Sequence, residues 1–367
     1  MNEHTNVSMN QLLSRDETIL MRGVAIFFIM IHNFLHLLLP VKENEFVYNP
    51  SNFRLFIEHI KNQPEWIWAD VFSFLGWYGV VVFIFLSAYG LSKKYESLET
   101  SNESTCQFII RHWKKTVKLM LLPMIIYAVL VSIARSQLFS LKKLFLQLSL
   151  VSNFTFPELI EPGVFWFFGL IFQLYVVYRL LIYRRSPFFL LSLSVLSIGI
   201  IILYATLNRS TSMLMHNFIG WMLPFSLGII ASRYDISRFI DKSWKCYLIL
   251  MSGLFLMILM NANIYTWSLS PLIAVVVSVS FVKILKRSSF IRKLGELSAF
   301  IFVMHPIVRL IMQSNYMKAL FRVNESSPYT MNLVTYTVVF VILSIFGAKL
   351  YSILLNIRLV KHNEYNY

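Results

Sequence analysis

The sequence predicts an all-α protein, a polytopic transmembrane helical bundle of about ten spans, on the strength of two observations. First, 57% of its 367 residues are hydrophobic and only 14% are charged, whereas soluble proteins average about 25% charged residues. A water-soluble domain of this size could not bury so much apolar surface. Second, the apolar residues form long unbroken runs, without the apolar–polar alternation of barrel strands. Because a span in lipid must be a helix or a closed barrel, these runs predict helices.

Ten apolar runs reach the roughly twenty residues that a helix needs to cross a bilayer. They cover residues 19–40, 66–92, 116–135, 163–183, 187–206, 213–232, 246–263, 267–285, 295–313 and 329–356. No soluble domain fits between any two of them, so we expect one transmembrane domain at 19–357 with cytoplasmic tails at 1–18 and 358–367. The first tail is polar and the first run has the length of a span, so we expect no cleavable signal peptide.

The distribution of Lys and Arg predicts the orientation, because these residues accumulate on cytoplasmic loops. With the amino terminus inside, the inner segments hold nineteen of them and the outer segments hold nine. This bias places both termini in the cytoplasm. It also accounts for the net charge of +15 without a nucleic-acid partner, since no soluble basic stripe has interleaved aromatic residues. Cys106 and Cys246 then lie on or near the cytoplasmic side, where thiols stay reduced, and we expect no structural disulfide.

Two outer segments are long enough to carry function. Residues 41–65 contain charges and aromatic side chains, and residues 137–162 include the amphipathic stretch 138–151, which could lie flat on the outer interface. Either segment could shape a polar acceptor site, and either could be a plain connector.

The first span contains three ionisable residues, and such residues in a span are costly enough to indicate function. Arg22 lies one turn into the span, His32 follows ten residues later, about 15 Å along a helix, and His36 shares a face with His32. A neutral imidazole can take a proton from a hydroxyl, and an arginine can hold a phosphate. The alternative is that Arg22 snorkels to the headgroups and His32 makes an interhelical hydrogen bond. Since the two histidines have no evident third ligand, we expect no metal.

Other charged residues lie within or at the ends of the spans. Three of them are near the ends and favour snorkelling, namely Arg179, Lys283 and Lys349. Arg309 follows His305 by four residues, with Pro306 between them to loosen the helix. Asp70 and Glu296 lie at span ends, and either could orient a histidine.

Five motifs occur in order along nearly the whole chain. They are the pair Arg22 and His32, residues 83–91 in the second span, the basic segment 111–118 followed by Pro123, residues 166–175 in the fourth span, and residues 294–306 in the ninth. In this order the motifs resemble the signatures of the acyltransferase 3 family of bacterial membrane acyltransferases. Members of that family typically move an acetyl group, with cytoplasmic acetyl-CoA as the donor, onto hydroxyls of cell-envelope polysaccharides. The resemblance implies a location in the bacterial inner membrane and a carbohydrate acceptor on its outer side.

The resemblance also implies roles for individual residues. His32 would be the catalytic base or acyl carrier, and Arg22 would orient the donor. The basic segment would attract the phosphates of the coenzyme through Arg111, Lys114, Lys115 and Lys118. The remaining residues expected to bind donor or substrate are Ser87, Tyr89, Trp166, His305 and Arg309.

This chain departs from the family pattern at three positions. The step from Arg22 to His32 is ten residues where the family usually has eleven, which turns His32 by roughly 80° around the helix and puts Asn33 at the eleventh position. Ala88 replaces the usual glycine after Ser87, and Gln173 replaces a common glutamate. The altered step leaves three alternatives: a locally rewound helix, a base that points at a different angle, or impaired chemistry.

Two other functions stay open from the sequence. A polysaccharide exporter or flippase would use aromatic residues such as Trp77, Trp166 and Trp221 to line a sugar path, although such residues more often anchor spans or fill a bundle. A membrane sensor or scaffold would need a soluble signalling domain, and the sequence shows none. A homo-oligomer is compatible with either function.

Overall fold

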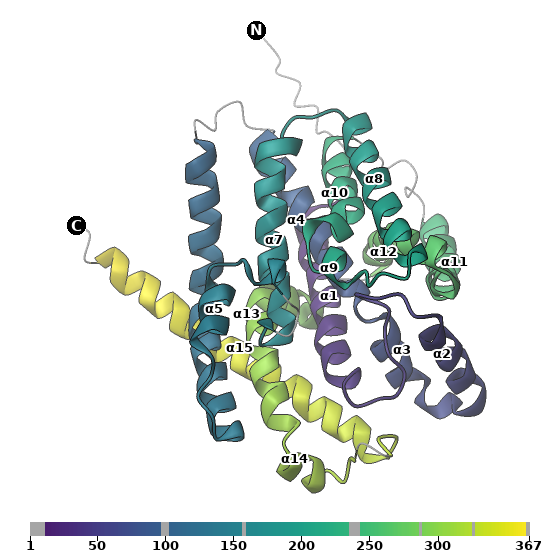
Figure 1. Ribbon diagram of the computed structural model, residues 1–367, viewed down its shortest axis with the longest axis vertical. Coiled ribbons are helices and arrows are strands. Elements are labelled where there is room, and N and C mark those ends of the chain that lie inside the picture. The colour runs from purple at the N-terminus through teal and green to yellow at the C-terminus, as the bar shows by residue number, and fades with distance from the viewer. Residues whose placement is uncertain are drawn as a thin grey trace.

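The computed structural model describes residues 12–96, 103–155, 159–234, 243–285, 288–324 and 327–364, with side chains up to residue 355. Parts of the two predicted tails, and of the basic loops at 235–242 and 286–287, lie outside these residues. Within the described chain every regular element is a helix (Figure 1). The prediction of an all-α fold is therefore confirmed.

The described chain contains fifteen α-helices joined by turns and short 3₁₀ segments. In order they are α1 (Arg15–Leu35), α2 (Pro50–Asn62), α3 (Ile67–Leu75), α4 (Tyr78–Glu96), α5 (Thr105–Arg135), α6 (Leu141–Leu148), α7 (Trp166–Val177), α8 (Pro187–Thr206), α9 (Ser212–Met215), α10 (Met222–Arg233), α11 (Ser243–Leu259), α12 (Ile264–Ile284), α13 (Ser289–Met312), α14 (Asn315–Leu320) and α15 (Asn332–Glu364). A π-helical turn, Tyr178–Ile182, extends α7.

Eight helical segments of the described chain are long and apolar enough to cross a membrane. They are Arg15–Leu35, Thr105–Arg135, Gly163–Ile182, Pro187–Thr206, Ser243–Ala262, Ile264–Ile284, Ser289–Met312 and Asn332–Leu355. The second predicted run is a pair of helices, Pro64–Leu75 and Tyr78–Glu96, which are bent by 43° and count as a ninth span if taken together. The sixth predicted run forms the shorter apolar helix Phe218–Arg233. The polytopic bundle is thus as predicted, and the structure differs from ten regular spans at these two runs.

Local sequence sets the ends of the long helices. α1 begins at a capping box, in which the Ser14 hydroxyl accepts from the Glu17 backbone N–H and the Glu17 carboxylate accepts from the Ser14 N–H. Ser104 and Gln107 form the same box at the start of α5. From its cap, α1 continues as regular α-helix to Leu35. The angle between Arg22 and His32 is therefore that of an unbroken helix, and the alternative of a rewound helix is wrong.

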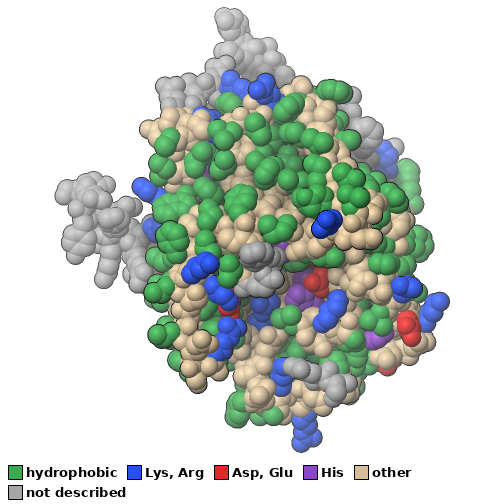
Figure 2. Space-filling view, in the orientation of Figure 1, with side chains coloured by type: hydrophobic (Ala, Val, Ile, Leu, Met, Phe, Trp, Pro, Cys, Tyr) green, Lys and Arg blue, Asp and Glu red, His purple; other side chains and the backbone are tan. Residues whose placement is uncertain are grey.

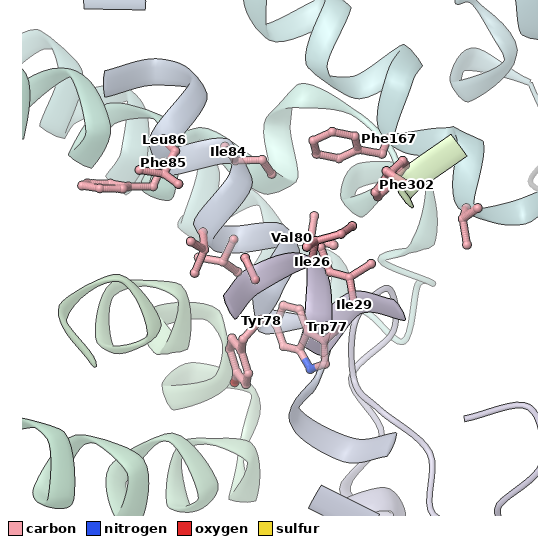
Figure 3. Packing of buried hydrophobic residues seen from close by; sticks show 14 of the residues in the cluster. Ile26, Ile29, Trp77, Tyr78, Val80, Ile84, Phe85, Leu86, Phe167 and Phe302 are labelled. Atoms are coloured by element: carbon pink, nitrogen blue, oxygen red, sulfur yellow. The ribbon is translucent and has the colours of Figure 1, made fainter. Parts of the chain in front are cut away.

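α1 is the central helix of the bundle. Within its apolar window 67% of the residues are buried, against 17% in the peripheral span that contains α11. α1 packs against α3, α4, α12 and α13. Figure 3 shows Ile26 and Ile29 of α1 close to Trp77 and Val80, where α3 turns into α4. A residue on α1 can therefore meet groups from several other helices.

Two glycines let the bent pair of helices approach α1. A Cβ atom on Gly76 would lie 2.5 Å from the Cβ of His32, and one on Gly79 would lie 2.6 Å from the carbonyl oxygen of Ala25. Real side chains do not tolerate such distances, so both positions require glycine. This close packing brings the end of α3 against the histidines of α1.

The two ends of the bundle differ in their elements. Figure 1 shows α2, α3 and α14 toward the end of the bundle at which α1 finishes, whereas α5 begins toward the end at which α1 starts. His32 lies near the carboxyl end of α1 and Arg22 near its start. The predicted base and the predicted donor-binding residues thus occupy different depths of one bundle.

Candidate active site

His32 is a buried histidine whose proton position is determined by its neighbours. Its side chain is 2% exposed, and its Nδ1 lies 3.2 Å from the carbonyl oxygen of Phe72 and 3.1 Å from that of Ser73. A carbonyl oxygen can only accept, so Nδ1 carries the hydrogen and donates it. Nε2 then holds the lone pair, and it is buried without a partner. His32 therefore presents an unpartnered base to the interior.

The backbone that holds His32 is itself fixed. The hydroxyl of Ser73 donates to the carbonyl oxygen of Val41 at 2.6 Å, which ties α3 to the segment that follows α1. Phe72 also packs its ring against Phe27 and Phe28 of α1, with ring centroids 6.0 and 4.9 Å apart. The two carbonyl oxygens consequently fix the orientation of the imidazole as well as its tautomer.

His36 and Glu43 complete a cluster with His32. The rings of His32 and His36 are 4.7 Å apart between centroids, and His36 Nδ1 lies 3.1 Å from Glu43 Oε1. Burial acts to raise the pKa of Glu43, but the charge and hydrogen bond of His36 outweigh it and lower that pKa to about 2. Glu43 is thus an anion beside the two histidines. Its other oxygen, Oε2, is buried without a partner.

Sequence reasoning missed Glu43, although it lies in the charged outer segment 41–65. The ligand atoms of His32, His36 and Glu43 all lie within 4.8 Å of one another, which is a set that could hold a metal ion. Two histidines and a carboxylate are a common ligand set of catalytic zinc, and a backbone carbonyl on the other ring nitrogen is its usual support. The expectation of no metal assumed no third ligand, and that assumption was wrong. Without a metal, His32 Nε2 is a proton acceptor next to the hydrogen-bonded pair of His36 and Glu43.

Arg22 lies at the other end of α1. Its Nε donates to the Thr18 carbonyl oxygen at 3.3 Å, and its side chain is partly buried. A groove of about 510 Å³ opens beside this end of the helix, where Lys283 forms an ion pair with Glu17 at 2.9 Å. Arg22 does not contact His32, so it cannot share a ligand atom with the base. Only a long substrate could reach both residues.

The predicted donor-binding residues on α4 and α5 lie at the same end as Arg22. Arg111 donates to Glu103 at 2.7 Å and to the Tyr95 hydroxyl. Further along α5 three lysines are exposed, Lys114, Lys115 and Lys118. On α4, Ser87 hydrogen-bonds Tyr175, and the Tyr89 hydroxyl donates to the Leu13 carbonyl oxygen at 3.2 Å. These residues form one basic end of the bundle, apart from His32.

Trp166 lies away from that basic end. Its ring contacts Phe46 and His216, with centroids 5.0 and 5.6 Å apart, and stacks on Trp221. Trp221 in turn meets Trp77 edge to face. The three tryptophans are 5% exposed or less, so they fill the bundle.

His305 and Arg309 approach α1 from α13. His305 is fully buried, and its Nδ1 lies 3.0 Å from the Ile301 carbonyl oxygen, while its Nε2 is buried without a partner. Arg309 donates from Nη1 to the Asn33 carbonyl oxygen at 3.0 Å. Asn33, the residue at the eleventh step from Arg22, donates to the Ile29 carbonyl oxygen. The structure therefore brings Arg309 next to the residue that follows His32.

Asp70 orients a different histidine, which the sequence did not indicate. Its Oδ2 lies 3.4 Å from Nδ1 of His59 on α2, and its Oδ1 accepts a hydrogen bond from the Tyr329 hydroxyl. Tyr329 also lies 3.3 Å from His59 Nδ1. Glu296 pairs with Arg292 on an exposed face of α13 and orients no histidine in the described chain.

Three comparisons bear on this arrangement. The family model of an acyltransferase domain matches residues 16–350, nearly the whole chain. No curated protein matches the sequence, and no solved structure matches it.

Proposed function

The chain belongs to the acyltransferase family whose domain model it matches over residues 16–350, and we propose that it is a membrane O-acetyltransferase of cell-envelope polysaccharides. Membership of this family agrees with the motifs in the sequence and makes the protein a membrane acyltransferase. The proposal adds acetyl-CoA as the donor, a sugar hydroxyl as the acceptor and His32 as the base. One observation supports it most: the buried Nε2 of His32 has no partner, while its Nδ1 is held by two carbonyl oxygens.

In the proposed reaction, His32 Nε2 accepts the proton of the acceptor hydroxyl. The hydroxyl oxygen attacks the carbonyl carbon of the thioester, the carbon–sulfur bond breaks, and the proton passes from the imidazolium to the leaving thiolate. Glu43 is an anion within 4.8 Å of the histidine ligand atoms, so it favours the transient positive charge on His32. General-base catalysis of this kind contributes about 10²–10⁴ in rate.

The donor would enter from the basic end of the bundle, which we take to be the cytoplasmic side. Arg22 and the exposed Lys115 and Lys118 supply positive charge for the phosphates of acetyl-CoA. Lysine carries the charge without the fork of arginine, so these residues would attract the coenzyme more than orient it. The acetyl end would then reach about 15 Å along α1, from the level of Arg22 to that of His32.

The test is acyl transfer by the purified protein from labelled acetyl-CoA to an envelope polysaccharide fraction. We expect labelled ester in the polysaccharide with the wild type and loss of that label with His32→Ala. Metal content of the same preparation, measured by mass spectrometry, separates the two uses of the cluster: a stoichiometric ion would assign His32, His36 and Glu43 as ligands. Glycan movement across vesicles without any label transfer would support an exporter and contradict the proposal.

A further inference from the structure

We propose that Arg309 binds an anionic group of the acceptor, so that the substrate is an acidic glycan with a carboxylate or phosphate near the hydroxyl that is acylated. This inference rests on the proposed function and names its substrate class. It starts from an arginine inside a membrane helix, which is costly enough to require an explanation.

Most N–H groups of the Arg309 guanidinium have no hydrogen-bond acceptor in the described chain. The guanidinium has five N–H groups, and in the described chain its one hydrogen bond is the 3.0 Å contact with the Asn33 carbonyl oxygen. No described carboxylate lies within ion-pair distance of it. The side chain is partly exposed, and none of its remaining nitrogens is buried without a partner. Those nitrogens therefore keep accessible surface on which a ligand could bind.

Arg233 shows how this bundle neutralises a partly buried arginine. Its Nε lies 2.6 Å from Oε2 of Glu96 and its Nη2 lies 2.8 Å from Oε1, so the two side chains form a bidentate pair between α10 and α4. Such a pair satisfies both charges within the protein. Arg309 has the same fork and lacks the carboxylate. An anion from outside the chain would complete it in the same way.

Side chains around Arg309 leave no spare carboxylate for it. Tyr127 on α5 packs against α13, lies within electrostatic reach of Arg309, and hydrogen-bonds Glu161. Glu161 already accepts from Arg135 at 2.7 Å and from Lys143 at 2.8 Å. The nearest carboxylate on this side is thus held by two cations.

Among the described residues, the region around His32 and His36 offers no free carboxylate for Arg309 either. Glu43 is paired with His36, and Lys42 donates to the His36 carbonyl oxygen. Burial, and then the charge of Glu43, raise the pKa of Glu45 well above its ordinary range, which disfavours a negative charge there. Figure 2 shows a hollow near the middle of this face, with basic, acidic and histidine side chains at its margin. Of the charged groups that these contacts connect to Arg309 and to the histidines, four are the cations of Arg309, Arg135, Lys143 and Lys42. They outnumber the carboxylates of Glu43, Glu45 and Glu161, so the surplus charge is positive.

The location of Arg309 suits an acceptor better than a donor. Its backbone anchor, Asn33, is the residue directly after His32, and it lies at the end of α1 opposite to Arg22 and the basic segment of α5. An acidic group held by the guanidinium fork would place a hydroxyl of the same or the neighbouring sugar toward His32. A guanidinium binds a carboxylate or a phosphate through two parallel hydrogen bonds, which gives orientation as well as affinity.

The first experiment identifies the acylated unit. Envelope glycans from cells that make the wild type or His32→Ala are compared by mass spectrometry, and the residue whose ester depends on His32 is located. We expect that unit to carry a carboxylate or a phosphate, and the same spectra distinguish the two. An ester on a neutral glycan would overturn the inference and leave the proposed function intact. Absence of any His32-dependent ester would refute the proposed function itself.

The second experiment assigns the anion to Arg309. Transfer by purified protein is measured on the native acceptor and on the same acceptor with its acidic groups methyl-esterified, which keeps the hydroxyls. We expect esterification to lower kcat/KM of the wild type by about 10- to 100-fold, the effect of losing a charge-assisted pair. Arg309→Gln should already have the lower value and should not respond to esterification.

Two variants guard against a merely structural effect. Arg309→Lys keeps the charge without the fork, so it should discriminate between the two acceptors by less than the wild type but more than Arg309→Gln. Arg292→Gln, at the exposed opposite end of α13, should discriminate as the wild type does. If Arg309→Gln lowered transfer to both acceptors equally, Arg309 would be a structural residue and the inference would be wrong.

Discussion

Two clusters in this protein combine histidine with a carboxylate, and they differ in what they leave unsatisfied. In the open cluster of His32, His36 and Glu43, the Nε2 of His32 and the Oε2 of Glu43 are buried without partners. In the closed cluster of His59, Asp70 and Tyr329, the tyrosine hydroxyl lies between the carboxylate and the imidazole. The atom that lacks a hydrogen-bond partner in this cluster is a carboxylate oxygen, Asp70 Oδ2, which lies 3.4 Å from Nδ1 of His59. Both clusters touch the same short helix, α3.

We propose that the difference separates a reactive arrangement from a structural one. A buried polar atom without a partner costs about 1–3 kcal/mol, so a fold retains one only where something else is gained. In the open cluster the unpartnered nitrogen is also a base with a fixed tautomer. In the closed cluster the side chains fasten α2 and the segment before α15 to α3. Mutation of matched residues in the two clusters can test this distinction.

The largest expected effect comes from removing one histidine from each cluster. His32→Ala should lower acyl transfer by about 10²–10⁴, because it removes the proposed general base. His59→Ala should leave transfer within about twofold of the wild type, since this cluster holds no buried ring nitrogen without a partner and the hydrogen bond from Tyr329 to Asp70 remains. Transfer is measured with labelled acetyl-CoA, and monodispersity in detergent serves as the folding control. If both substitutions lowered acyl transfer equally, the unpartnered nitrogen of His32 would not explain its importance. Proximity of a histidine to a carboxylate would then be the feature that matters.

The next effect concerns the stability of the open cluster in acid. The pKa of Glu43 is about 2 in the folded protein, below its ordinary value of 4.5, so the unfolded chain binds a proton first as pH falls. The stabilisation is complete above pH about 4.5 and is lost as pH falls toward 2. At about 1.4 kcal/mol per pKa unit it amounts to about 3 kcal/mol.

Glu43→Gln should therefore flatten the fall in unfolding temperature between pH 6 and 3. Glu58→Gln, which removes an exposed carboxylate from α2, is the matched control and should follow the wild type. An unchanged acid profile in Glu43→Gln would mean that His36 does not hold this carboxylate as an anion.

The sequence predicted the parts of this protein that depend on local pattern. Apolar runs predicted the helical bundle, and the spacing of four residues placed His32 and His36 on one face, as the 4.7 Å ring contact confirms. The groups that set the tautomer of His32 could not be predicted, because the carbonyl oxygens of Phe72 and Ser73 reach it through a bend between α3 and α4 whose packing needs Gly76. No local pattern encodes that approach. The partner of Asp70 was equally hidden, since Tyr329 lies 259 residues away along the chain.

The smallest expected effect tests the closed cluster as a fastening. Burial, and then the neighbouring carboxylate of Asp70, raise the pKa of Tyr329, so its hydroxyl stays protonated and donates to Asp70. Tyr329→Phe keeps the ring, with its contact to Trp66 at 5.5 Å, and leaves Asp70 buried with its histidine contact alone. We expect it to lower the free energy of unfolding by about 1–3 kcal/mol and to leave acyl transfer at the wild-type level. Thermal unfolding and transfer on the same preparation measure both. If acyl transfer fell while the free energy of unfolding did not, Tyr329 and Asp70 would take part in the reaction. The proposed contrast between a reactive open cluster and a structural closed cluster would then be wrong.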